Sequence, residues 1–372
     1  MIGEYKMDNK YIVGFFIQNP FHYYLYESVI DSLVSKSITC HLILNDMLKD
    51  DNEWVNMYYG LINFVEDIDR KDIEAFVFST VVASGFQYDC VISPYYHNNI
   101  GQIGKKHIRL MYSLAKESWT YSWWNVFYDK ILCYGDYDFR KLNIYNNCEK
   151  IGNPKFDKWF RGGLPDYSEI KKEHNLSLDE TKKTILYVPT YGELSSIDQW
   201  IKEIKDISNK FNIIIKLHHG TVYLQSEEYR RNYIKQNFLN VLNDAADLLK
   251  ILKITDYVLS DNSGVIYDAV LAEKNIILLN TTHNHQINDH TIESKIREKI
   301  VNIDVGTKIL EILQAKDLWG SQKKILSEIK NTLFFKADGF AGERAANEVI
   351  KLLSQANDHN HFLLSLREKI FY

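Results

Sequence analysis

Short runs of apolar residues alternate with longer amphipathic segments along most of the chain, and this alternation limits the possible folds most strongly. Runs that are apolar throughout, and not only at every second position, are typical of parallel strands that helices cover on both faces. In the first part of the chain such runs lie at 11–17, 39–45, 88–94, 107–113 and 128–135. The pattern at 22–36 predicts a helix, and the stretch 73–85 fits a helix and a strand equally well.

The alternation resumes after a polar segment, 152–183, which holds two of the five prolines. Further strands are predicted at 184–190, 212–219, 256–260 and 275–280, and the pattern from about 307 onward is helical. A chain of 372 residues is too long for one compact core. We therefore predict two doubly wound α/β domains in tandem, at 1–150 and 151–350, followed by a helical tail at 351–372.

Charge and cysteine content exclude several classes of protein. The net charge is −5 with interspersed signs, whereas a nucleic-acid-binding domain would show a basic stripe. No two of the four cysteines have CxxC spacing, so a zinc site is not expected, and their apolar surroundings indicate buried free thiols in a reducing cytoplasm. These cysteines are Cys40, Cys90, Cys133 and Cys148. No signal peptide and no transmembrane helix are expected, because no basic segment precedes a long apolar stretch and no window approaches 18 uninterrupted apolar residues.

A run of small polar residues, Ser-Asp-Asn-Ser-Gly at 260–264, stands where an apolar strand gives way to a helix. Ligands of parallel sheets bind beyond the carboxyl ends of the strands, where the first turn of a helix offers free N–H groups to an anion. Ser260, Ser263 and the amides of 263–265 would then form a phosphate site, with Asp261 holding the turn through backbone hydrogen bonds. The alternative is that these residues only cap the helix, since caps prefer the same residue types.

Two further polar motifs follow predicted strands of the same domain. Lys216, His218 and His219 end the strand 212–219, and a histidine there could donate to a phosphate oxygen or protonate a leaving group. A histidine satisfied by the backbone of a tight turn is the alternative. Thr190 and Tyr191 end the strand 184–190, where Thr190 could contact a phosphate and Tyr191 could stack on a base, although Pro-Thr-Tyr-Gly also makes an ordinary turn.

The predicted strand ends of the first domain carry candidates for binding an acceptor. Gln18, Asn19 and His22 follow the strand 11–17, and His97 follows the strand 88–94 together with two tyrosines. Aromatic rings there can cover the apolar faces of sugars, or they can simply close the core. The aromatic stretch 117–124 could be an acceptor wall, a membrane-facing patch or a packed loop.

A histidine-rich stretch at 282–290 could in principle bind a metal ion, but His283 and His285 would need a third ligand. We expect a solvated loop there and no metal site.

Five motifs occur in an order that resembles the CDP-glycerol glycerophosphotransferase family, which includes teichoic-acid and capsule polymer transferases. They are IGNPKFDKWF, ILYVPTYGE, IIIKLHHGT, LSDNSGVIYDAVLAEKNIILLN and ADGFAGERAANEVIKLL. The resemblance covers roughly 107–350 and implies a GT-B fold, in which two Rossmann-like domains face a cleft. It also implies transfer of a polyol phosphate from a CDP-polyol to a hydroxyl of a growing polymer, with release of CMP and no metal or other cofactor. The implied donor site in the C-terminal domain consists of Thr190, His218, Ser260, Asn262, Ser263, Gly264 and Asp268.

The sequence departs from this family at two places. Relatives carry a His-Gly pair, whose histidine is the base for the acceptor hydroxyl, where this chain has Tyr112 and Ser113. Because an unperturbed tyrosine has a pKa of about 10, it is a poor base at neutral pH. Another group could serve instead: His22, His97, His107 or Asp129. Relatives also commonly carry His-Pro where this chain has a second histidine, His219.

The expected function is therefore transfer of glycerol- or ribitol-phosphate to a glycan or lipid-linked polymer acceptor, in cell-surface polysaccharide synthesis. The catalytic candidates are His218, Tyr112 and His22. Such an enzyme would work in the cytoplasm at the inner face of the membrane, and any attachment would be weak because no basic amphipathic helix is evident. Two alternatives remain: a GT-B glycosyltransferase that uses a UDP- or CMP-sugar, and a non-catalytic protein that binds a nucleotide or glycan.

Overall fold

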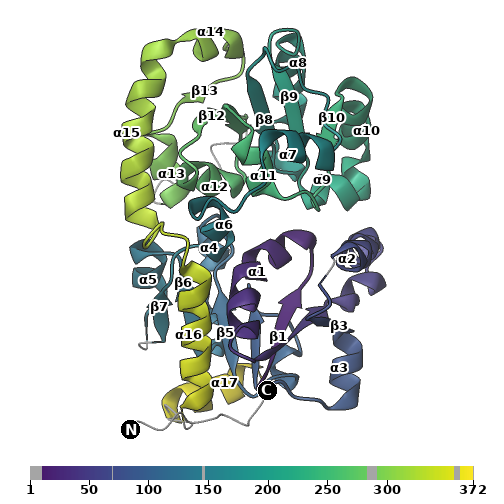
Figure 1. Cartoon of the computed structure of the whole chain (residues 1–372), viewed down its shortest axis with the longest axis vertical. Coiled ribbons are helices and arrows are strands. Elements are labelled where there is room, and N and C mark those ends of the chain that lie inside the picture. Colours follow the sequence, from purple (N-terminus) through teal and green to yellow (C-terminus); the bar gives the residue numbers. More distant parts are fainter. Residues whose placement is uncertain (1–10, 69, 145–146, 283–290, 356–360, 372) are drawn as a thin grey trace.

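Two parallel β-sheets organise the chain, and helices surround each of them (Figure 1). The computed structural model describes residues 11–68, 70–144, 147–282, 291–355 and 361–371. The first sheet has the strand order β3-β2-β1-β4-β5-β6-β7 and the second the order β10-β9-β8-β11-β12-β13. All the strand pairs described are parallel, as the continuous apolar runs predict.

The strands begin and end close to the apolar runs. Those of the first sheet are β1 (Ile12–Ile17), β2 (Thr39–Leu44), β3 (Glu74–Val77), β4 (Cys90–Ser93), β5 (His107–Leu110), β6 (Lys130–Cys133) and β7 (Cys148–Lys150). Those of the second are β8 (Thr184–Val188), β9 (Asn212–Lys216), β10 (Asn240–Leu242), β11 (Tyr257–Ser260), β12 (Asn275–Leu279) and β13 (Asn302–Ile303).

The helices of the first unit are α1 (Pro20–Val34), α2 (Val55–Asp67), α3 (Phe78–Ser84), α4 (Glu117–Thr120) and α5 (Asp136–Leu142). The polar segment between the sheets contains α6 (Asp157–Phe160) and α7 (Tyr167–Glu173). The second unit has α8 (Ile197–Asp206), α9 (His219–Tyr223), α10 (Glu228–Asn237), α11 (Leu248–Lys253), α12 (Val265–Leu271), α13 (Ile292–Arg297) and α14 (Ile309–Gln314). The chain ends with α15 (Lys316–Leu333), α16 (Ala341–Ser354) and α17 (His361–Phe371). The ambiguous stretch 73–85 is both elements in succession, since β3 runs directly into α3.

Each sheet has a point at which its connections change direction. The chain runs outward from β1 through β2 to β3 and then returns to β4 on the other side of β1. In the second sheet it runs from β8 through β9 to β10 and returns to β11 beside β8. The loops that leave the carboxyl ends at such a switch point diverge, and ligands of doubly wound folds bind there.

Alternate side chains of the second sheet pack into two different cores. In β8, Leu186 and Val188 belong to a large cluster that continues into the first unit, whereas Ile185 and Tyr187 belong to a smaller cluster on the opposite face. This is the two-residue period of a strand, with both faces buried. The four cysteines are buried free thiols, as predicted.

The last helices return to the first unit. Helix α15 contacts both α12 and α5, and α16 packs on α1 (Figure 1). Asp157 joins the returning segment to the start of the polar segment, because its carboxylate accepts the N–H groups of Ala341 at 2.9 Å and Gly342 at 2.7 Å. These are the first two residues of α16, whose N–H groups have no partner within the helix. The predicted C-terminal domain, 151–350, includes most of α16, and this helix packs on α1 of the first unit.

We expect the packing of α16 on α1 to fail when a methyl group is added at Gly342. A Cβ atom there would lie 2.7 Å from the backbone carbonyl carbon and oxygen of Ser28, which cannot move aside. Gly342→Ala should therefore lower the free energy of unfolding by about 1–3 kcal/mol, measured by chemical denaturation. Gly320 in α15 is the matched control, because a Cβ atom there meets nothing within 4 Å and Gly320→Ala should stabilise the protein by about 0.5–1 kcal/mol. Equal effects of the two substitutions would contradict this packing.

Candidate functional site

The carboxyl ends of the two sheets face each other, and residues that follow the strands make contact between the units. Phe21, at the start of α1, stacks on His219, which follows β9, with ring centroids 6.0 Å apart. The backbone N–H of Lys116 donates to the carboxylate of Glu293 at 2.6 Å. The fold therefore brings the predicted donor and acceptor motifs to one region, which we call the interdomain site.

A buried carboxylate holds the switch point of the second sheet. Asp261 is fully buried after β11, and its oxygens accept the N–H groups of Thr190 and Ser196 and the hydroxyl of Ser196, each at 2.8 Å. Burial raises the pKa of this carboxyl, although these hydrogen bonds oppose the shift. The prediction that Asp261 holds the turn through backbone hydrogen bonds is confirmed, and the carboxylate also fixes Thr190 beside the turn.

The polar residues of the turn are used in different ways. The hydroxyl of Ser260 donates to the carbonyl of Val188 at 3.0 Å and is fully buried. It therefore links β11 to β8 and is not accessible to a ligand. The hydroxyl of Ser263 accepts the N–H of Val265 at 3.4 Å, a weak cap of α12. At Gly264 a Cβ atom would lie 2.7 Å from the hydroxyl of Ser113, so this first-unit residue reaches the start of α12.

Arg297 is a residue of this site that the sequence motifs do not identify. Its guanidinium donates to the side-chain oxygens of Asn280 at 2.8 Å and Asn262 at 2.9 Å, and to the backbone carbonyl of Asp261. Together with Glu293, one helical turn earlier on α13, it lines a narrow crevice beside Ser263. The only signal in the sequence is a Glu and an Arg four residues apart after the histidine-rich stretch, and that spacing is common on any helix.

Two histidines of the site are held in one tautomer by backbone amides. The Nδ1 atom of His218 accepts the N–H of Gly220 at 3.1 Å, and the Nδ1 atom of His22 accepts the N–H of Gln18 at 3.2 Å. A neutral imidazole that accepts at Nδ1 carries its proton on Nε2. Burial lowers the pKa of His22 to about 3, and burial together with nearby cations lowers the pKa of His218. Both rings are thus neutral hydrogen-bond donors. The alternative interpretation, in which a histidine is hydrogen-bonded to the backbone of a turn, holds for the Nδ1 atom of each ring but not for its Nε2 atom.

Aromatic rings surround these histidines. Tyr191 stacks on His218 with centroids 4.6 Å apart and an interplanar angle of 22°, and His218 lies 3.9 Å from His219. On the side of the first unit, the ring of Tyr112 lies about equally far from Phe21, at 6.0 Å, and from His22, at 6.1 Å. Burial raises the pKa of Tyr112 to about 12, so an even smaller fraction of it is deprotonated at neutral pH than of an exposed tyrosine.

The remaining acceptor candidates lie at the switch point of the first sheet or beside it. The side-chain oxygen of Gln18 accepts the hydroxyl of Tyr95 at 2.7 Å, which fixes Gln18 between β1 and β4. Asn19 is buried, and its side-chain oxygen has no partner among the residues that the structure describes. His97 packs instead on Phe16 and Phe78, and its Nδ1 pairs with the carbonyl of the next residue.

Two predicted donor residues have partners within the protein. The ammonium group of Lys216 donates to the backbone carbonyls of Asn243 and Asp244, each at 3.2 Å. Asp268 forms an ion pair of 2.6 Å with Lys155, which lies in the polar segment between the sheets. This pair links the segment to α12.

Two alternative bases are remote from the site. His107 begins β5 and pairs with the carbonyl of Gly104, and Asp129 precedes β6 and pairs with Arg367 of α17. Both therefore lie at the amino edge of the first sheet, and the structure excludes them as bases at the carboxyl edge.

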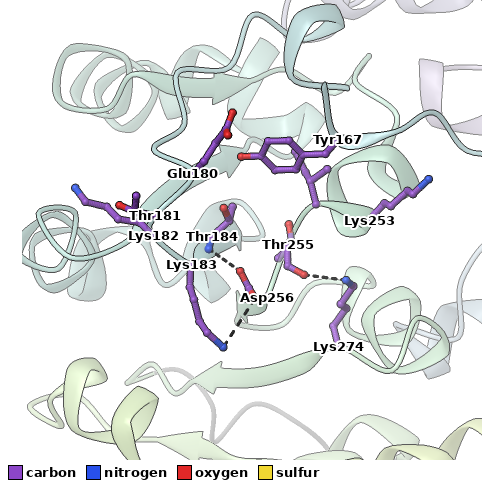
Figure 2. Close-up of a pocket in the computed structure, with 11 residues that line it drawn as sticks. Tyr167, Glu180, Thr181, Lys182, Lys183, Thr184, Lys253, Thr255, Asp256 and Lys274 are labelled. Atoms are coloured by element: carbon purple, nitrogen blue, oxygen red, sulfur yellow. Dashed lines mark hydrogen bonds and ion pairs between the residues drawn. The ribbon is translucent and has the colours of Figure 1, made fainter. Parts of the chain in front are cut away.

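A larger concavity, of about 690 Å³, lies at the opposite edge of the second sheet, by the amino ends of β8 and β11 (Figure 2). Lysines line it, but Lys253 and Lys274 donate to backbone carbonyls and Asp256 and Glu180 offset the positive charge. None of the motif residues lies there, so it is separate from the interdomain site. In the described ranges no three His, Cys, Asp or Glu side chains are placed to hold a metal ion, and His283 and His285 fall outside those ranges.

Two Rossmann-like units with opposed switch points define a GT-B fold. Residues 113–285 match the model of the family described as CDP-Glycerol:Poly(glycerophosphate) glycerophosphotransferase. The resemblance predicted from the sequence motifs is thereby confirmed. No curated protein matches the chain.

Solved structures of two kinds share the fold. A variant of the wall teichoic acid polymerase TagF, soaked with CDPG, is 14% identical with a TM-score of 0.65, over 94% of this chain and 90% of that chain. A putative UDP-N-acetylglucosamine 2-epimerase from Listeria monocytogenes is also 14% identical, with a TM-score of 0.59 over 94% and 98%. The UDP-GlcNAc 2-epimerase from Neisseria meningitidis, bound to UDP-GlcNAc, is 13% identical with a TM-score of 0.56 over 92% and 100%. At these identities the likeness establishes the fold alone.

Asp261→Asn should unfold the switch point of the second sheet. An amide presents one acceptor where the carboxylate presents two, so at least one buried N–H loses its partner at a cost of about 1–3 kcal/mol. We expect a lower free energy of unfolding by about that amount or more in urea. Asp304→Asn is the control, because Asp304 is exposed and should tolerate the change. An unchanged stability of Asp261→Asn would show that the carboxylate does not organise the turn.

The stability of the protein should fall between pH 7.5 and pH 5.5 partly because of His22. The unfolded chain binds a proton at His22 below a pKa of about 6.5, but the folded chain does not until a pKa of about 3, so acid favours unfolding. His22→Gln removes this contribution. The wild type should therefore lose about 1 kcal/mol more than this variant over that interval, measured by denaturation at both pH values. His361→Gln, on the exposed first residue of α17, is the matched control and is measured at the same two pH values.

Proposed function

We propose that this protein transfers a polyol phosphate, such as glycerol phosphate, from a CDP-activated donor to a hydroxyl group of a polymer acceptor. The observation that carries the proposal is His218. Its Nδ1 atom is occupied by the backbone N–H of Gly220, which leaves Nε2–H as a neutral donor for a ligand, within a region that matches a glycerophosphotransferase family. The soak of TagF with CDPG supports a CDP-linked donor for this fold.

The donor diphosphate would lie between His218 and the turn at Ser263 and Gly264. When the bond to CMP breaks, negative charge develops on the departing phosphate. The Nε2–H of His218 and the N–H groups at the start of α12 stabilise that charge without rearranging, and fixed donors of this kind usually contribute most to catalysis. The stacked ring of Tyr191 restricts rotation of the His218 ring, which keeps the Nε2–H group in a fixed orientation.

Arg297 would act on the same phosphates indirectly. It donates to the side chain of Asn262 and the backbone carbonyl of Asp261, and so holds the turn in addition to Asp261's own carboxylate. Its positive charge also adds to the attraction for an anion at this edge of the sheet.

The acceptor would approach from the first unit, past Phe21 and the tyrosines at the carboxyl ends of β4 and β5. Stacked rings suit the apolar face of a sugar or polyol chain. We propose that the acceptor is a glycan or lipid-linked polymer end, and that the enzyme works on the cytoplasmic side of the membrane with weak peripheral attachment. No helix among the described residues is long and apolar enough to cross a membrane.

A second candidate is a GT-B glycosyltransferase with a UDP- or CMP-sugar donor. The epimerase bound to UDP-GlcNAc favours it, because a nucleotide sugar occupies a structure of this fold. The two candidates differ in the nucleotide that they bind. Stabilisation by CDP and CMP, and not by UDP or GDP, supports the first in a thermal-shift series, whereas a preference for UDP supports the second.

His218→Asn should separate the fold from the function. Asparagine still accepts the N–H of Gly220 as a helix cap but cannot place a donor where Nε2 lies. We expect CDP affinity to fall by about 10- to 100-fold, the worth of a hydrogen bond to a charged group, and transfer from CDP-glycerol to be abolished. Ser263→Ala should weaken CDP binding in the same assay and also abolish transfer.

Lys183→Ala, in the concavity at the opposite edge of the second sheet, is the control for nonspecific phosphate binding (Figure 2). It should leave both CDP affinity and transfer unchanged. If His218→Asn and Ser263→Ala keep full affinity and activity, the donor site is elsewhere.

A further inference from the structure

The proposed reaction needs a group in the interdomain site that removes a proton from the acceptor hydroxyl. Three histidines of the site, His22, His218 and His219, differ in whether a ring nitrogen is free to accept that proton. His22 and His218 carry their protons on Nε2, and their Nδ1 atoms already accept backbone N–H groups. Neither ring can therefore accept a further proton without losing a hydrogen bond that fixes it. Both are donors of hydrogen bonds and not bases.

His219 is the remaining imidazole of this group. Neither of its ring nitrogens has a hydrogen-bond partner in the described part of the chain, and the residue is only partly buried. Its orientation is nevertheless fixed by stacking: Phe21 lies 6.0 Å away on the side of the first unit and His218 3.9 Å away on the side of the donor turn. The ring thus stands between the acceptor side and the donor side of the site.

A carboxylate is the other group with a free acceptor atom nearby. The Oδ2 atom of Asp244 has no partner among the described residues, while its Oδ1 accepts the hydroxyl of Tyr223 at 2.9 Å. However, Asp244 is 3% exposed and lies against Lys216, whose charge it balances. Its free oxygen is buried, so an acceptor hydroxyl has no access to it in this structure.

We propose that His219 is the general base of the transfer reaction, an inference that rests on the proposed function. A free ring nitrogen of His219 takes the proton of the acceptor hydroxyl, and the oxygen forms a bond to the phosphorus that carries the polyol. The bond from that phosphorus to the bridging oxygen breaks, and CMP leaves with the electron pair. The protonated His219 then returns its proton to solvent.

The surroundings of His219 make its basicity depend on the donor. Burial and the cations Lys116 and Lys216 lower its pKa to about 3 in the free protein, with His218 and His22 as its neutral neighbours. A diphosphate bound beside these lysines neutralises the charge that opposes protonation and therefore raises the pKa of His219 toward its ordinary value of about 6.5. The base becomes effective when a donor is in place.

The first test reads the imidazoles directly in the full chain, by long-range ¹H–¹⁵N NMR of the histidine rings at a series of pH values, with and without CDP. The spectra should show His22 and His218 with Nε2–H throughout. His219 should titrate below pH 5 in the free protein and at least one pH unit higher with CDP. The proposal is overturned if CDP binds without moving the titration of His219, or if His219 is the ring whose Nδ1 is locked.

The second test measures transfer from CDP-glycerol to a soluble glycerol-phosphate oligomer. His219→Ala should lower kcat by about 100- to 10,000-fold, as expected for loss of a general base, while the KM for CDP-glycerol changes less than about threefold. Added imidazole should restore part of the activity, which a purely structural role would not allow. Asp244→Asn and His361→Ala should both keep their kcat.

The outcomes also separate this inference from the proposed function. A wild type that transfers glycerol phosphate together with a fully active His219→Ala would refute the base and leave the function intact. Loss of kcat in Asp244→Asn and not in His219→Ala would assign the base to the carboxylate. A wild type that neither binds CDP nor turns over CDP-glycerol would refute the proposed function, and the ring spectra of the free protein would still decide whether His219 is the imidazole with free nitrogens.

Discussion

The buried carboxylate of Asp261 is the interaction on which the arrangement of the second unit depends. It binds the N–H groups of Thr190, after β8, and of Ser196, before α8, and it does so from the turn that follows β11. Since β8 and β11 are neighbouring strands at the switch point, one side chain connects the loops that follow both strands. A buried charge is costly unless it is fully hydrogen-bonded, and here the backbone supplies the donors. The same residue could repel a bound phosphate, but its oxygens are turned into the protein and occupied.

The domain order and most strands are predictable because they depend on local patterns. Apolar runs such as 11–17 and 184–190 can satisfy their backbone only in a covered sheet, and the turns at their carboxyl ends place Gln18, Thr190 and His218 on the correct edge. The motifs also predicted that Asp261 holds its turn, because a carboxylate among small polar residues can accept the backbone N–H groups of the turn.

The parts that the sequence did not reveal depend on distant contacts. Lys216 and Asp268 lie in the predicted motifs, but their partners, the carbonyl of Asn243 and the ammonium of Lys155, come from other elements. Arg297 follows residues that no motif covers. The tautomer of His22 depends on one backbone N–H four residues earlier, and the exclusion of His107 as a base follows from which end of β5 it occupies. The spacing of residues in the sequence does not specify these hydrogen-bond partners, this tautomer or this position in the sheet.

The return of α16 to the first unit has a consequence for how the chain is made. Helix α1 lies near the beginning of the chain, but the helix that covers one of its faces, Ala341–Ser354, lies near the end. Domains generally fold as units while the ribosome is still adding residues. Here the first lobe emerges with one face of α1 uncovered and stays so while the whole second lobe is synthesised. The face of α1 that α16 covers therefore stays open in the nascent chain until Ala341–Ser354 has been made, and the order of synthesis makes the second lobe the first to be completed.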